Sequence, residues 1–249
     1  MHRLFLRLCV VVIPVIALGC SGEVNEPTTG TYRAVLELPG GEAPFGLHIA
    51  RESGQFVLYL DNAKERTKVT DVQVVDGELR ATFPGNEKNS LRAKLKRKSL
   101  EGEVALLQTG GERQTIPFHA TLGETHRFFA KTPTDNADFS GRWAVVLTNG
   151  DGKTTPAVAL FDQQHGQLTG TVMTAAGDHR FLAGEVRDEE AQLSMFAGGP
   201  VHLYRLEVTD DGGLAGEYWG LKVHATLVAE RNPDAELIDA AATDMQPSQ

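Results

Sequence analysis

Alternating hydrophobic and polar residues dominate the chain after its first thirty positions. In residues 91–98, Leu91, Ala93 and Leu95 share one face of an extended segment, and charged residues occupy the other face. Residues 32–38 show the same alternation. A two-residue period predicts β-strands that bury one face against a core.

Turn-forming pairs separate these predicted strands at short intervals. They include Ser53-Gly54, Asp76-Gly77, Asn149-Gly150 and Asp211-Gly212. Short strands without long helical segments between them favour an antiparallel meander over alternating strands and helices. The fold class is therefore all-β, and only residues 233–243, in the Ala-rich tail, favour a short C-terminal helix.

Two stretches of the chain share landmarks in the same order, which indicates an internal duplication. Each opens on a Gly-x-aromatic motif, continues through a Leu-x-Gly-Glu motif and ends on His-Ala-Thr-Leu. The paired landmarks are Gly30–Leu36 with Gly141–Leu147, Leu100–Glu103 with Leu214–Glu217, and His119–Leu122 with His224–Leu227. We expect two tandem antiparallel units, each barrel-like with roughly eight strands.

These landmarks divide the chain into six parts. We predict a signal peptide at 1–19, a tether at 20–29, a first β unit at 30–122, a linker at 123–138, a second β unit at 139–232 and a tail at 233–249.

The N-terminus carries a targeting signal. Arg3 and Arg7 precede an uncharged run from Leu8 to Leu18, which is too short to span a bilayer. The run ends in Ala17-Leu18-Gly19-Cys20, which resembles the lipobox of a bacterial lipoprotein. The resemblance implies cleavage before Cys20, acylation of its thiol with chains such as palmitate, and outer-membrane sorting toward the periplasm. The alternative is an ordinary secretory signal with an incidental cysteine.

Composition excludes several functional classes. Lys and Arg number 24 against 33 Asp and Glu, a formal net charge of −9, which argues against a nucleic-acid partner. Cys9 and Cys20 are the only cysteines, so the body of the chain can form no disulfide, catalytic thiol pair or cysteine zinc site. No histidine spacing typical of a metal site occurs, and we expect no cofactor.

Residues 139–236 resemble the β domain that precedes the thioredoxin domain in TlpA-type, thioredoxin-like disulfide reductases. Pieces that carry the resemblance are Gly141-Arg142-Trp143, Leu168-Thr169-Gly170-Thr171, Gly216-Glu217-Tyr218 and Arg231-Asn232-Pro233. In that family a Cys-x-x-Cys redox domain follows, whereas this chain ends soon afterwards without a cysteine. The resemblance therefore implies an accessory domain alone. The Gly-x-Trp motif is also similar to the opening of avidin-like and lipocalin-like barrels.

Few residues suggest chemistry. His119 and His224 recur in both units, and either pack structurally or contact a ligand or partner. Trp143 is expected to plug a barrel end, and Tyr218 with Trp219 could line a barrel mouth or a protein contact. Asp178-His179-Arg180 is interpreted as a solvated hairpin. No nucleophile elbow or isolated carboxylate pair occurs, so no catalytic residue and no metal ligand is predicted.

The favoured hypothesis is a non-catalytic envelope lipoprotein, held on the membrane lipid by acylated Cys20, that binds a protein or a small apolar ligand. One alternative is an accessory to a separate thioredoxin-like reductase, which rests on the resemblance alone. The other is a hydrolytic enzyme whose site assembles across strands.

Overall fold

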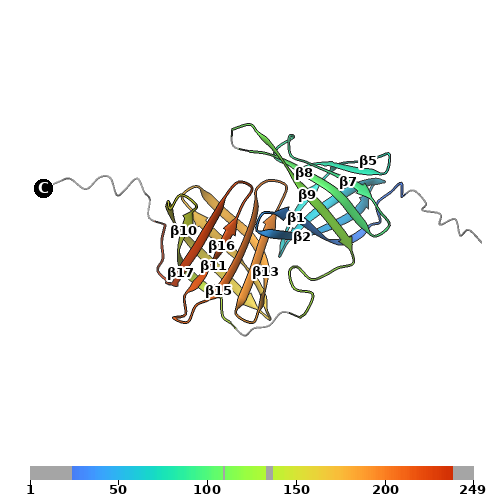
Figure 1. The fold of residues 1–249 in the computed structure, drawn as a ribbon. Coiled ribbons are helices and arrows are strands. Elements are labelled where there is room, and N and C mark those ends of the chain that lie inside the picture. The colour runs from blue at the N-terminus through green and yellow to red at the C-terminus, as the bar shows by residue number, and fades with distance from the viewer. Residues whose placement is uncertain (1–23, 109, 133–136, 238–249) are drawn as a thin grey trace, which may run out of the picture.

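The computed structural model describes residues 24–108, 110–132 and 137–237 (Figure 1). Within these residues every regular element is a strand, which confirms the all-β prediction. The predicted signal peptide and Cys20 lie outside the described residues. Residues 233–237 form a turn and irregular chain, so the predicted C-terminal helix is wrong there, and the rest of the tail lies outside the described residues.

The first unit is one antiparallel sheet of nine strands. Its order is β4-β3-β2-β1-β9-β8-β7-β6-β5, so β4 and β5 are its two edges although they are consecutive in the chain. The sheet curls until it is nearly closed. Its strands are β1 Gly30–Leu38, β2 Gly41–Glu52, β3 Gln55–Asn62, β4 Glu65–Val69, β5 Asp71–Val75, β6 Glu78–Thr82, β7 Ser90–Leu95, β8 Ser99–Leu107 and β9 Arg113–Leu122.

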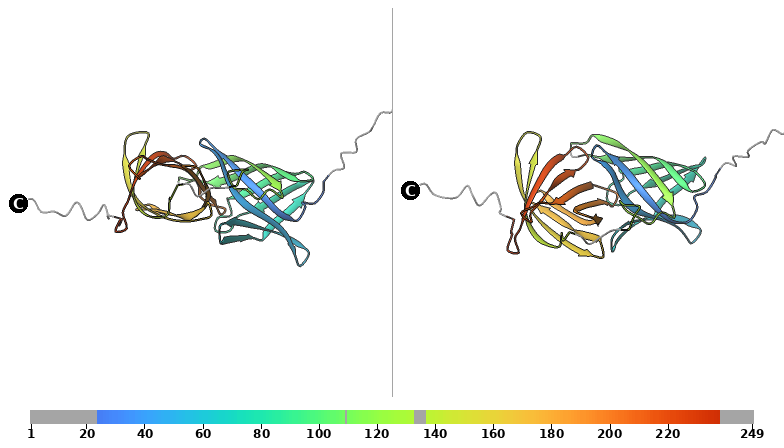
Figure 2. Two further views of the ribbon diagram at one scale, coloured as in Figure 1. Left: turned by 90° about the horizontal axis from the view of Figure 1, so that it is seen from below. Right: turned by 60° about the horizontal axis from the view of Figure 1, so that its bottom comes forward.

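The second unit is a closed barrel of eight antiparallel strands, seen end-on as a ring in the left view of Figure 2. Consecutive strands pair, and β17 closes the ring on β10. Its strands are β10 Gly141–Asn149, β11 Thr154–Gln164, β12 Gln167–Thr174, β13 Gly177–Arg187, β14 Glu190–Phe196, β15 Val201–Val208, β16 Leu214–Trp219 and β17 His224–Arg231. The prediction of two barrel-like units of about eight strands is confirmed.

The register shows which landmarks of the duplication are equivalent. Gly102 in β8 and Gly216 in β16 both press on the preceding strand, because an added Cβ would lie 2.0 Å from Arg92 O and 2.1 Å from Arg205 O. Tyr32 lies opposite Leu122, whereas Trp143 lies opposite Arg231, four residues beyond Leu227. The openings and the Gly-Glu motifs therefore correspond, but the His-Ala-Thr-Leu motifs do not.

The two units share a hydrophobic core. The interior of the first unit includes four side chains from the outer face of β14–β16, namely Phe196, Val201, Leu203 and Trp219. Trp219 presses against Gly40, where an added Cβ would lie 2.2 Å from the indole ring. A larger residue at Gly40 would therefore separate the units.

The linker reinforces this contact through Arg127. Its guanidinium donates hydrogen bonds to Asn62 Oδ1 in the first unit (3.0 Å) and to Ser194 O in the barrel (2.9 Å). Its backbone N–H and those of the next two residues donate to the buried carboxylate of Glu185 at 2.8–2.9 Å. Burial lowers the pKa of Arg127 to about 9, so it stays charged at neutral pH.

We predict that Arg127→Ala destabilises the protein by about 3 kcal/mol, because it removes the guanidinium hydrogen bonds to Asn62 and Ser194 and leaves Glu185 without its charge partner. Chemical denaturation would measure the loss. Lys131→Ala, in the exposed part of the same linker, is the matched control and should change the unfolding free energy by less than about 0.5 kcal/mol. Equal effects of the two variants would contradict this role.

Candidate functional site

The two ends of the barrel differ in character. At the base, where β10 begins, Trp143 is fully buried and its indole N–H donates to Phe139 O (3.0 Å). The Arg231 guanidinium lies over the Trp143 ring, 4.3 Å from its centroid. Trp143 therefore occupies the barrel-end position expected from the sequence, and aromatic and cationic groups close the base.

The opposite end, which we call the mouth, contains four polar aromatic side chains inside the barrel. This mouth cluster consists of His179, His202, Tyr204 and Tyr218, from β13, β15 and β16. Tyr204 Oη lies 2.6 Å from His179 Nδ1, and Tyr218 Oη lies 3.0 Å from His202 Nδ1. The ring centroids of the two imidazoles lie 3.9 Å apart and those of the two phenols 4.8 Å apart. The hydrogen-bonded pair of His179 and Tyr204 therefore stacks face to face on the pair of His202 and Tyr218.

Burial keeps the mouth cluster neutral. It lowers the pKa of His202 to about 3, with a contribution from neighbouring His179, and it lowers the pKa of His179 as well. It raises the pKa of Tyr218 to about 12 and that of Tyr204 well above its usual value. In the tautomer whose Nδ1 is unprotonated, each neutral phenol donates to Nδ1, and the proton of the imidazole lies on Nε2.

A cavity of about 630 Å³ lies where the mouth meets the first unit. His202 and Tyr218 form its barrel side, together with loops 197–200 and 220–223. The first unit contributes residues of the β6–β7 loop and the end of β8. We call this space the inter-unit cavity. Its volume is in the range of small-molecule sites.

Polar groups in and beside the cavity wall bridge the units. Asn89 is buried, donates to Gly198 O (3.0 Å) and accepts from Leu107 N (2.8 Å). Gln108 Nε2 is buried beside the cavity without a hydrogen-bond partner among the described residues. Gln108 Nε2 is enclosed by protein atoms, so it faces the packed wall and not the open space of the cavity.

The other predicted site residues do not meet at the mouth cluster. Trp219 faces the first unit and stacks on His224, with ring centroids 5.3 Å apart. His224 Nε2 lies 3.0 Å from Glu217 Oε1 on the outside of the barrel. His119 lies on β9, and its Nδ1 atom is 3.6 Å from Glu37 Oε1. Its predicted equivalence to His224 is wrong because the motifs differ in register.

Sequence reasoning missed His179 and His202. The interpretation of residues 178–180 as a solvated hairpin is wrong for His179, whose ring lies inside the barrel. The alternation of His202, Tyr204 and Leu206 on the apolar face of β15 was the available signal for His202. No comparable signal marked His179, because a bulge opposite Thr171 changes which side chains of β13 point into the barrel.

The mouth cluster lacks the parts of a hydrolytic site. Phenols, and not carboxylates, partner the two Nδ1 atoms, and neither Ser nor Cys hydrogen-bonds to either ring among the described residues. The residues that the structure describes also contain no group of three or more potential metal ligands of the His, Cys, Asp and Glu types. What the site offers is stacking surface and hydrogen bonding.

The comparisons with known proteins add little to this picture. No family model matches the chain, and no curated protein matches it. A protein of unknown function of the DUF3598 family from Nostoc punctiforme matches at 12% identity and TM-score 0.29, over 81% of this chain and 95% of that one. A Bacteroides fragilis protein provisionally described as an outer membrane protein matches at 10% identity and TM-score 0.27, over 82% and 97%. TM-scores this low carry no functional argument.

The depressed histidine pKa values predict acid sensitivity. The unfolded chain protonates His202 near pH 6.5 and the folded chain near pH 3, so the stability that depends on neutral His202 is complete above pH 6.5 and falls between these values. We expect a loss of up to about 1.4 kcal/mol per pH unit from one histidine. Denaturation midpoints from pH 7 to 4 would show a shallower decline for His202→Phe.

His165→Asn is the control, because His165 is an exposed turn residue with φ 52° that asparagine tolerates. It should leave the pH dependence unchanged. An identical decline in wild type and His202→Phe would refute the assignment.

Proposed function

We propose that the protein is a non-catalytic binding module of the bacterial cell envelope, anchored through acylated Cys20, that takes a small and largely apolar molecule in the inter-unit cavity. The observation that carries the proposal is the meeting of two features at one place. These are a cavity of ligand size and a neutral polar-aromatic cluster, of which His202 and Tyr218 line the cavity.

The cavity lining indicates the chemistry of the ligand. Leu107, Pro84, Pro200 and Val223 give apolar contact, and Tyr218 gives an aromatic face. Lys222 is the only charged residue in the described lining, and its ammonium group, which is paired with the exposed Glu112, is the cationic donor at the cavity edge. These groups favour an apolar body that carries a carbonyl, carboxylate or sulfonate oxygen.

Two other hypotheses remain predictions. A role beside a thioredoxin-like reductase rests on the resemblance of residues 139–236 alone, and a hydrolytic role lacks a positioned nucleophile among the described residues. The part of the chain that the structure describes has no helix able to cross a bilayer. Membrane attachment is proposed through the lipid on Cys20 because residues 17–20 resemble a lipobox.

Filling the cavity tests the ligand site. Gly199 lies in the cavity wall and has no atom within 4 Å of an added Cβ, so Gly199→Trp places an indole there without displacing the core. We expect this variant to bind the apolar sulfonate 1-anilinonaphthalene-8-sulfonate at least about tenfold more weakly than wild type in a fluorescence titration.

Gly150→Trp is the matched control. Gly150 also has open space around an added Cβ and lies in the β10–β11 turn at the same barrel end, outside the cavity lining. It should bind the sulfonate like wild type. Equal affinity in both variants, or no saturable binding to wild type, would refute the ligand site.

Cys20→Ser tests the anchor. We expect this variant to lose incorporation of labelled palmitate and to leave the membrane fraction, because only a thiol at the cleavage site accepts the lipid. Cys9→Ser, within the apolar run of the signal, should keep both properties. Membrane retention of the Cys20→Ser protein would contradict the anchor without bearing on the cavity.

A further inference from the structure

An aliphatic row crosses four adjacent strands on the outside of the barrel. Pro156 on β11 lies opposite Val146 on β10, Val146 lies opposite Val228 on β17, and Val228 lies opposite Ala215 on β16. Val146 is 40% exposed and Val228 57%, although both are large apolar side chains. We call these four residues the Pro–Val row. Nothing among the described residues covers it.

The first unit shows how the same feature is used elsewhere in the chain. There Pro44 lies opposite Val35, the positions equivalent to Pro156 and Val146. Both residues are buried, because the outer face of β14 packs on β2 and the Ser194 hydroxyl donates to Pro44 O. In the first unit, the outward Pro–Val pair is therefore covered by another segment of the chain.

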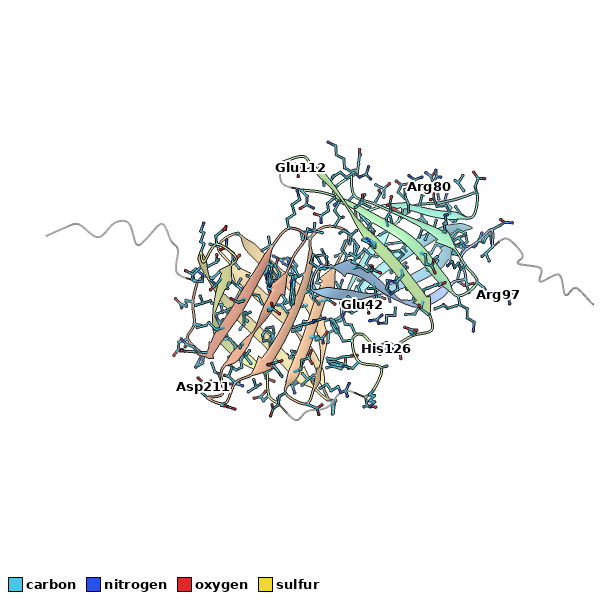
Figure 3. All side chains as sticks on the ribbon, viewed as in Figure 1. Glu42, Arg80, Arg97, Glu112, His126 and Asp211 are labelled. Atoms are coloured by element: carbon cyan, nitrogen blue, oxygen red, sulfur yellow. The ribbon has the colours of Figure 1, made fainter. Side chains whose placement is uncertain are left out.

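The Pro–Val row forms the floor of a groove of about 710 Å³. One wall is the β15–β16 turn, with Asp211 labelled at the lower left of the barrel in Figure 3. The other wall is the chain after β17, held by a hydrogen bond from Arg142 Nη1 to Ala235 O (2.7 Å). The described lining contains no Lys or Arg. The rim carries four exposed carboxylates, those of Asp211, Glu230, Asp234 and Glu236.

We propose that this groove binds a short segment of a partner protein whose aliphatic side chains are flanked by Lys or Arg. The aliphatic side chains would cover the Pro–Val row, and the cations would meet the acidic rim.

The negative charge of the rim distinguishes three possible occupants of the groove, namely a second copy of the chain, the chain's own tail and a basic partner segment. A second copy of this chain, docked row against row, would bring its own four carboxylates against these four. Residues 238–249 carry Asp239 and Asp244 and no basic residue, so their charge also has the wrong sign. A basic, aliphatic partner segment is the occupant that matches both the floor and the rim.

Fluorescence anisotropy with the full chain tests the proposal. The probe is a labelled nine-residue peptide that alternates lysine and valine, and its counterpart carries glutamate in place of lysine. We expect saturable binding of the lysine peptide and none of the glutamate peptide. Val146→Lys/Val228→Lys should weaken binding at least about tenfold, and so should Asp211→Lys/Glu230→Lys, which leaves the row intact.

Val75→Lys is the matched control, because Val75 is an apolar residue of similar exposure (38%) on β5 of the first unit. It should bind like wild type, and thermal melts should show that all variants fold. Failure of the lysine peptide to bind, or equal binding by the groove variants, overturns the proposal.

Two further results would also overturn it by identifying another occupant. One is a concentration-dependent dimer in sedimentation that Val146→Lys/Val228→Lys abolishes. The other is tighter binding of the lysine peptide after removal of residues 238–249, which would mean that the chain's own tail covers the groove. Neither result would affect the inter-unit cavity.

Discussion

The structure depends on one contact, in which the outer face of the barrel completes the core of the first unit. The nine-stranded sheet does not close between β4 and β5, and Phe196, Leu203 and Trp219 of the barrel are part of its hydrophobic core. Burial of each such side chain contributes about 2 kcal/mol, so the first unit depends on the barrel for stability. The same contact places the barrel mouth beside the β6–β7 and β8–β9 loops, which creates the inter-unit cavity.

The mouth cluster shows how an otherwise apolar barrel tolerates four polar rings. Burying an imidazole or a phenol is costly unless it is hydrogen-bonded. Here each phenol is hydrogen-bonded to an imidazole Nδ1, and stacking covers the ring faces. Because the partners are neutral, no charge has to be buried at neutral pH. The cluster is thus compatible with a stable fold while its Nε2 protons remain as donors.

The sequence predicts the strands and the duplication well, because period two and turn residues are local signals. It fails where register matters. The His-Ala-Thr-Leu motifs look equivalent because a slip of four residues along a strand preserves which side chains face inward. His179 could not be placed for the opposite reason. The bulge at Phe181, with φ 62°, reverses the facing of the residues before it, and nothing local in the sequence marks that bulge.

The two units differ in what covers their outward Pro–Val pairs, although the pairs occupy the same positions. Pro44 and Val35 are covered by the barrel, whereas Pro156 and Val146 face outward without a cover among the described residues. The neighbouring row on the barrel, Thr154, Thr148 and Thr226, shows that this surface accepts polar β-formers. Aliphatic side chains at the adjacent positions therefore are not required for strand formation. A contiguous exposed apolar row of this kind is typical of a surface that another molecule covers.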